Sequence, residues 1–107
     1  MASSEREGAT PSVVIEIVTF RLAPGTNVAE FKALDRTVEL QHVAKQPGFI
    51  SRESAAGDNG EWLVVVHWRS VRDAEASMAS FASAPAAQPF MADIDVPTMT
   101  MKRYVKP

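Results

Sequence analysis

EWLVVVHWRS, residues 61–70, is the segment that decides the fold of this chain. A β-strand directs alternate side chains to opposite faces of its sheet, so Val64, Val66 and Trp68 point one way while Leu63 and Val65 point the other. Both faces of this strand are therefore apolar. A sheet built around it needs cover on both sides, which a single layer of helices cannot supply.

Three further segments predict strands. Residues 12–22, SVVIEIVTFRL, are rich in β-branched side chains and form too short and unbroken an apolar run for a surface helix. Residues 48–56 predict a more polar strand at a sheet edge, joined to residues 61–70 by a hairpin because Gly57-Asp58-Asn59-Gly60 suits a tight turn. Residues 98–105, TMTMKRYV, alternate as a fourth strand.

Two helices are predicted between these strands. The first begins near Val28 behind a capping Thr26 or Asn27, and the second begins at Ser70 with Asp73. Their expected buried stripes are Phe31, Leu34 and Val38 in the first, and Ala74, Met78 and Phe81 in the second. A short helical turn is expected over residues 88–95. The order predicts an α+β, ferredoxin-like βαββαβ fold with a four-stranded antiparallel sheet and both helices on one face.

Composition sets further limits on function. The 107 residues fit one domain, over residues 12–107, behind a small polar tail of residues 1–11 that we expect to be disordered. A net charge of -2 does not favour a nucleic-acid partner, and no apolar run predicts a membrane span or a secretory signal, so we expect a cytoplasmic protein. With no cysteine and two histidines, we expect no metal site.

The second apolar face of the sheet predicts an association between copies. Helices on one side would leave an exposed patch of the kind that soluble monomers seldom tolerate. Besides Leu63 and Val65, that patch would contain either Ile15 and Ile17 or Val14 and Val18. We therefore expect a homodimer whose two sheets pack face to face.

With these elements in place, residues 13–104 resemble the antibiotic biosynthesis monooxygenase-like family of dimeric α+β barrel proteins. The resemblance rests on EIVTFRL at residues 16–22, on Pro47-Gly48-Phe49 opening the second strand, and on Trp68-Arg69-Ser70 closing the third. It implies two sheets packed across a dimer and, in each protomer, a pocket between sheet and helices that Trp68 lines. The family includes cofactor-independent oxygenases of polyketide aromatic rings, quinol oxygenases and haem-degrading enzymes.

Several family site residues are replaced in this chain. The aromatic-ring oxygenases carry an asparagine four residues before the tryptophan and a tyrosine six residues after it, where this chain has Val64 and Ala74. The haem-degrading members carry an asparagine before the Arg-Leu pair that ends strand one, and an iron-binding histidine on the second helix. Here Phe20 precedes that pair and no histidine follows His67. We therefore expect no haem and no other cofactor.

The candidate site residues are Trp68 and His42. An indole supplies a flat apolar wall and one N–H donor, although Trp68 is alternatively a core residue under the second helix. His42 follows the stripe of Phe31 and Val38 and is a candidate general base for a phenol or enol; alternatively it is a half-exposed histidine stabilised by the helix dipole. His67 faces away from Trp68 and is expected to be structural. The remaining predicted substrate contacts are Phe20, Phe31, Val64, Val66, Met78 and Phe81.

These residues suggest one principal function and two alternatives. The first is a cofactor-independent monooxygenase-like dimer that binds or oxidises a small apolar aromatic compound, polyketide-like or quinol-like, beside Trp68. The second is a non-catalytic ligand-binding or stress-related dimer of the same architecture, which the loss of the family's asparagine and tyrosine favours. The third is lyase or isomerase chemistry with His42 as the base.

Overall fold

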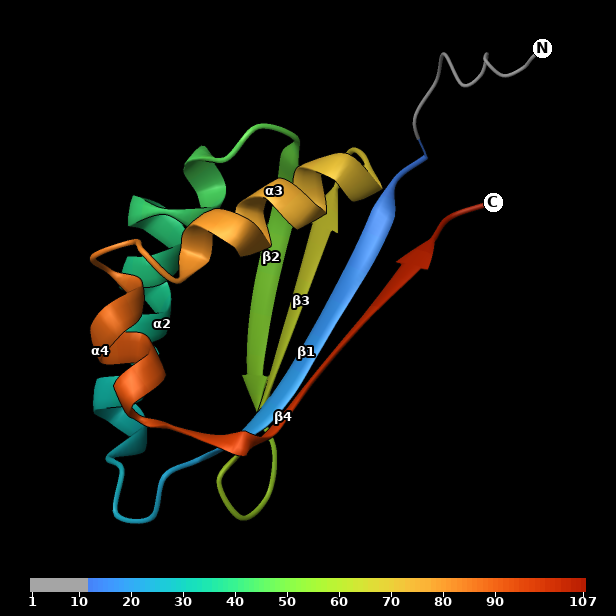
Figure 1. The fold of residues 1–107 in the computed structure, drawn as a ribbon. Helices are drawn as coiled ribbons and strands as arrows, with labels where there is room; N and C mark the ends of the chain where they lie inside the picture. Colours follow the sequence, from blue (N-terminus) through green and yellow to red (C-terminus); the bar gives the residue numbers. More distant parts are fainter. Residues whose placement is uncertain (1–11) are drawn as a thin grey trace, which may run out of the picture.

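The structure, a computed structural model, describes residues 12–107 and shows one sheet with helices over one face (Figure 1). The elements are, in order, β1 (Val14–Leu22), α2 (Val28–Gln41), the 3-10 turn η1 (Val43–Lys45), β2 (Phe49–Ala56), β3 (Glu61–Trp68), α3 (Val71–Phe81), α4 (Ala87–Ala92) and β4 (Ile94–Val105). This order confirms the predicted ferredoxin-like α+β fold. The tail predicted at residues 1–11 lies outside the described residues.

The sheet has the strand order β2-β3-β1-β4, with every neighbouring pair antiparallel. The two strands that are apolar on both faces, β1 and β3, are therefore central, and the polar β2 forms an edge as predicted. The last strand is longer than predicted, because β4 begins at Ile94 rather than at residue 98. The short helix α4 correspondingly ends at Ala92, before the expected end of that turn.

Side-chain caps fix the starts of both long helices. The Asn27 side chain accepts a hydrogen bond from the Glu30 amide at 3.0 Å, and the Ser70 hydroxyl accepts one from the Asp73 amide at 3.0 Å. Each cap satisfies an amide that the first helical turn leaves without a partner. Asn27, rather than Thr26, is thus the cap of α2.

Gly48 fixes the junction between β2 and α3. Its φ of 81° lies in the left-handed region, and a Cβ at this position would overlap the carboxylate of Asp73. Its carbonyl accepts a hydrogen bond from the Arg69 amide at 2.8 Å. These contacts bring Pro47-Gly48-Phe49 and Trp68-Arg69-Ser70 side by side, where Phe49 pairs with Trp68 in the sheet.

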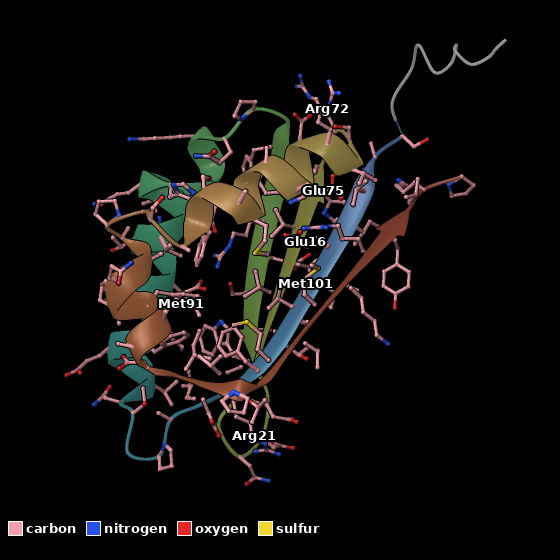
Figure 2. The ribbon with its side chains drawn as sticks, viewed as in Figure 1. Glu16, Arg21, Arg72, Glu75, Met91 and Met101 are labelled. Atoms are coloured by element: carbon pink, nitrogen blue, oxygen red, sulfur yellow. The ribbon has the colours of Figure 1, made fainter. Side chains whose placement is uncertain are left out.

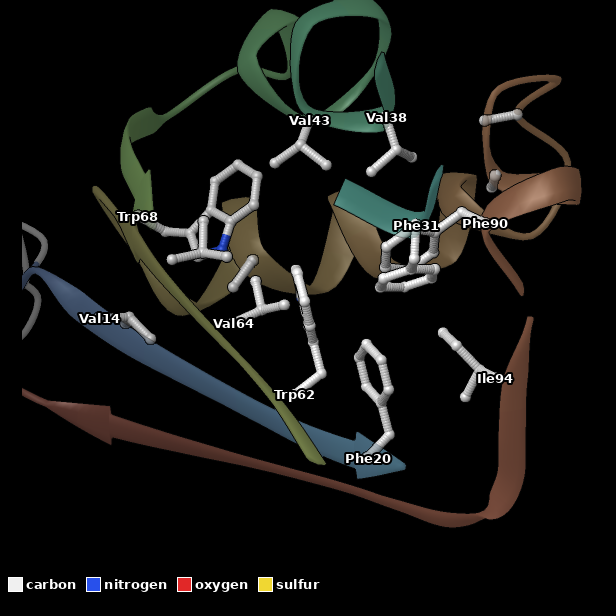
Figure 3. Packing of buried hydrophobic residues seen from close by; sticks show 14 residues of the cluster. Val14, Phe20, Phe31, Val38, Val43, Trp62, Val64, Trp68, Phe90 and Ile94 are labelled. Atoms are coloured by element: carbon white, nitrogen blue, oxygen red, sulfur yellow. The ribbon is translucent and has the colours of Figure 1, made fainter. Parts of the chain in front are cut away.

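The core lies between the sheet and the helices and is centred on aromatic rings (Figure 3). Phe31 on α2 stacks on Phe90 of α4, with ring centroids 5.0 Å apart, and meets the edge of Trp62 at the same distance. Phe20 packs edge-on against both Phe31 and Phe90. Edge-to-face and offset contacts of this kind suit the charge distribution of aromatic rings.

Both predicted helical stripes need correction. On α2 the buried residues are Phe31, Asp35 and Val38, while Leu34 is only half-buried. Asp35 can be buried because Arg52 of β2 pairs with it. On α3 the buried residues are Ala74 and Ser77, and Met78 is 41% exposed. Small side chains on the inner face of α3 leave space beneath this helix rather than filling it.

The other face of the sheet has no cover within the described chain. Leu63 and Val65 of β3 lie on it as predicted, and the register places Ile17 opposite Val65 on β1. Ile15 and Ile17, rather than Val14 and Val18, therefore complete this apolar outer face. His67 lies on the same face, where its Nδ1 is 3.3 Å from the Ser51 hydroxyl.

Candidate functional site

A cavity of about 390 Å³ lies between the inner face of the sheet and the helices. Its volume falls within the range of about 300–1,000 Å³ that is typical of small-molecule sites. Most of its wall is apolar and comes from β1, β3, β4, η1, α3 and α4. The apolar lining consists of Val18, Val43, Val64, Val66, Trp68, Met78, Phe81, Ala82, Phe90, Met91 and Met99.

Four polar residues complete the lining: Glu16, Arg52, Ser77 and Gln88. Glu16 lies on β1, in the space between that strand and α3 (Figure 2), and is only 4% exposed. Its Oε2 accepts a hydrogen bond from Arg103 Nε at 2.8 Å, and its Oε1 accepts one from Trp68 Nε1 at 3.3 Å. The carboxylate therefore orients the indole that forms one wall of the cavity.

Arg52 is held by two acidic side chains of α2. Its two terminal nitrogens donate to the two carboxylate oxygens of Asp35, at 2.8 and 3.1 Å, and one of them also donates to Glu39 at 3.2 Å. The Arg52 side chain is only 4% exposed and that of Asp35 only 10%. This bidentate pair joins α2 to the edge strand β2 and fixes the guanidinium at the cavity wall.

The predicted substrate contacts divide into two groups. Val64, Val66 and Trp68 of β3 line the cavity, together with Met78 and Phe81 of α3. Phe20 and Phe31 are not part of the lining, because both rings are enclosed in the aromatic cluster with Phe90. The structure thus gathers most of the predicted residues around one space and assigns the two phenylalanines of β1 and α2 to the core.

His42, the candidate base, lies outside the lining of this cavity. It ends α2 as the C-terminal cap residue, and its Nε2 is 3.1 Å from the Ser80 hydroxyl of α3. The Ser80 hydroxyl also lies 3.0 Å from the Ser77 carbonyl, to which it donates. Because the Ser80 hydroxyl proton is used in that hydrogen bond, the Ser80 oxygen is left to accept one from His42 Nε2–H. In this position His42 links the end of α2 to α3.

Glu16 and Arg52 are the site residues that sequence reasoning missed. Glu16 interrupts the inward-facing set Val14, Val18 and Phe20, and a charged residue at such a position was the available signal. Arg52 gave a weaker signal, because charged residues are common on both faces of a polar edge strand and do not by themselves indicate a site.

No group of three or more His, Asp or Glu side chains within residues 12–107 is arranged to hold a metal ion. None of the helices in that part of the chain is long and apolar enough to cross a membrane. The cytoplasmic location and the absence of a nucleic-acid partner stay predictions.

Comparison with known proteins gives matches in structure only. No protein-family model and no curated protein matches the sequence. Among solved structures, SnoaB, a cofactor-independent oxygenase from Streptomyces nogalater, superposes with a TM-score of 0.72 at 16% identity, covering 90% of this chain and 94% of that chain. A conserved protein from Methanosarcina mazei reaches 0.69 at 12% identity, with the same coverage of 90% and 94%.

A third similar structure is described as a candidate antibiotic biosynthesis monooxygenase from Chloroflexus aurantiacus, with a TM-score of 0.63 at 20% identity over 90% of this chain and 94% of that chain. These matches bear out the fold that the family resemblance implied. The chain has the same fold as a cofactor-independent oxygenase and a monooxygenase-like protein.

Proposed function

We propose that this protein binds a small, largely apolar aromatic compound in the cavity beside Trp68. The observation that carries the proposal is the composition of the lining, in which eleven apolar side chains surround four polar ones. Aromatic rings suit a planar ligand, and the lining includes the Trp68 indole and the rings of Phe81 and Phe90. A few convergent polar groups fix the ligand's orientation. Met78, Met91 and Met99 add flexible side chains that adapt to the ligand's shape.

If the protein is also an enzyme, we propose that it oxidises the bound compound without a cofactor. This proposal is supported by the fold shared with SnoaB, itself a cofactor-independent oxygenase. In such a reaction the deprotonated substrate supplies the electrons that reduce oxygen, so the protein has to bind, orient and deprotonate a polyketide-like or quinol-like aromatic.

A binding protein without catalytic activity is the second candidate. Val64 and Ala74 stand where the aromatic-ring oxygenases have polar site residues, and the charged groups of the lining, Glu16 and Arg52, are already paired with other side chains. A ligand-binding or stress-related role needs only the cavity, which these pairs leave intact.

Intrinsic fluorescence tests the binding proposal, because the two tryptophans differ in position. Trp68 lines the cavity whereas Trp62 lies in the core against Phe31. A planar quinol or anthrone should quench the Trp62→Phe variant saturably, since its remaining tryptophan is Trp68, and should leave the Trp68→Phe variant nearly unquenched. Equal quenching of the two variants, or none in either, would refute binding beside Trp68.

Oxygen consumption separates the two candidates. With the same quinols and anthrones, a catalytic protein consumes oxygen in proportion to protein concentration, beyond the uncatalysed rate. The His42→Ala variant should retain any such activity, because His42 lies outside the cavity. Saturable binding without oxygen uptake across the panel would assign the protein to the non-catalytic class.

We also propose that the protein is a homodimer whose outer sheet faces pack together. On that face Leu63 is 36% exposed and Tyr104 is 51% exposed, with Ile15, Ile17 and Val65 half-buried beside them. Drying an apolar side chain of this size contributes about 1.5–3 kcal/mol when burial is complete. A second copy supplies a matching face by symmetry.

A further inference from the structure

Glu16 is a carboxylate at the wall of a largely apolar cavity. Its side chain is 6% exposed, and each of its oxygens already accepts one hydrogen bond, from Trp68 and from Arg103. A carboxylate offers about four lone-pair positions, so about two remain. Of the Asp and Glu residues described by the structure, only Glu16 lines the cavity.

Taken together with their ion-pair partners, the two charged residues that line the cavity carry a net negative charge. Glu16 pairs with Arg103, and Arg52 pairs with both Asp35 and Glu39, which makes three carboxylates against two guanidinium groups. In a site of low polarity, charges of the same sign repel far more strongly than in water. A ligand anion beside Glu16 would meet this repulsion and would lose its hydration on entering.

The positive charge of Arg52 does not offset this repulsion, because Arg52 is already paired. Both of its terminal nitrogens donate to Asp35, and one also donates to Glu39. An incoming anion would have to compete with two carboxylates that are part of the fold. The positive charge at the cavity wall is therefore already neutralised.

We propose that Glu16 is the specificity-determining residue of this site and that it accepts a hydrogen bond from a hydroxyl group of the bound aromatic compound. Trp68 and Arg103 hold the carboxylate in position, so its free lone pairs are available without rearrangement. The site selects neutral aromatics that carry a hydroxyl, over the parent hydrocarbons and over aromatic carboxylates. This inference rests on the proposed binding of an aromatic compound in the same cavity.

Three probes of similar shape test the inference by calorimetric titration near pH 7. 1-Naphthol is neutral and donates a hydrogen bond, naphthalene has no polar group, and 1-naphthoate is an anion. We expect 1-naphthol to bind about 10-fold or more tightly than either of the others, since hydrogen bonds to charged groups contribute more than neutral ones. Binding of 1-naphthoate as tight as that of 1-naphthol would overturn the inference.

One variant and a matched control identify the residue responsible. Glu16→Gln keeps the size of the side chain and removes its charge, so the preference for 1-naphthol over 1-naphthoate should fall about 10-fold. Glu75→Gln makes the same change at an exposed position of α3, outside the cavity lining, and should leave that preference unchanged.

The outcomes also separate this inference from the proposed function. If none of the three probes binds the wild-type protein, the proposed function fails and this inference fails with it. If they bind but Glu16→Gln retains the full preference, only the role of Glu16 is refuted. Should Glu16→Gln fail to fold, the affinities of the wild-type protein decide the matter, because binding of naphthalene or 1-naphthoate as tight as that of 1-naphthol contradicts the proposal.

Discussion

Replacing Arg52 by methionine should remove a large part of the free energy of unfolding of this protein. Methionine approximates the length of the arginine stem but leaves Asp35, whose side chain is 10% exposed, without its partner at 2.8 Å. Removing one member of a buried ion pair typically costs about 3–5 kcal/mol, because the remaining charge stays out of water. A domain with about 5–15 kcal/mol of stability loses between about a fifth and all of it by such a change.

Urea denaturation followed by circular dichroism measures this loss at a fixed protein concentration. The matched control is Arg21→Met, since the Arg21–Glu61 contact is 3.7 Å long with side chains 46% and 58% exposed, and the hydrogen bond from Arg21 to the Asn59 carbonyl is also exposed to water. It should cost at most about 1 kcal/mol. The double variant Arg52→Met/Asp35→Leu should recover most of the loss, because it removes both buried charges. A cost for Arg52→Met no larger than that for Arg21→Met would refute the reasoning.

Three other substitutions have expected outcomes. Gly48→Ala should lower the free energy of unfolding by about 1–3 kcal/mol, because of its positive φ and the nearby Asp73 carboxylate; an unchanged urea midpoint would contradict this. Val65→Lys on the outer face should give a monomer in sedimentation at micromolar concentration, where the wild type should give a dimer; equal masses would argue against the dimer. Met78→Trp should fill the cavity and weaken binding of 1-naphthol about 10-fold, with little change in melting temperature because Met78 is 41% exposed; unchanged affinity would place the ligand elsewhere.

The fold could be predicted because the periodicity of each segment is unambiguous. Alternation in β3 predicted which of its side chains face the helices, whereas in β1 it left two alternatives that the register with β3 decides. The turn at residues 57–60 predicted the hairpin, where Asn59 and Gly60 have positive φ. The same alternation places Trp68 on the face toward the helices, and the family resemblance implied that it lines a pocket there. The local sequence pattern is sufficient to predict these elements, since each strand or helix is apolar on one face or on both.

The polar part of the site could not be predicted in this way. The partners of Glu16 are Arg103, 87 residues later, and Trp68, 52 residues later, and such pairs are formed only by strand register. His42 was a candidate for the cleft because it follows Phe31 and Val38 at helical spacing, but α2 ends at Gln41 and His42 is its C-terminal cap residue. Phe20 and Phe31 are apolar and inward-facing, and no sequence signal distinguishes a residue of the core from one at a cavity wall.

A crystal structure of the protein with 1-naphthol tests the central claim most directly. We predict the naphthalene ring against the Trp68 indole, inside the cavity, with the hydroxyl oxygen within hydrogen-bonding distance of a Glu16 carboxylate oxygen. A cavity without ligand at saturating 1-naphthol, or a ligand bound instead on the outer face near Ile17 and Val65, would contradict the account.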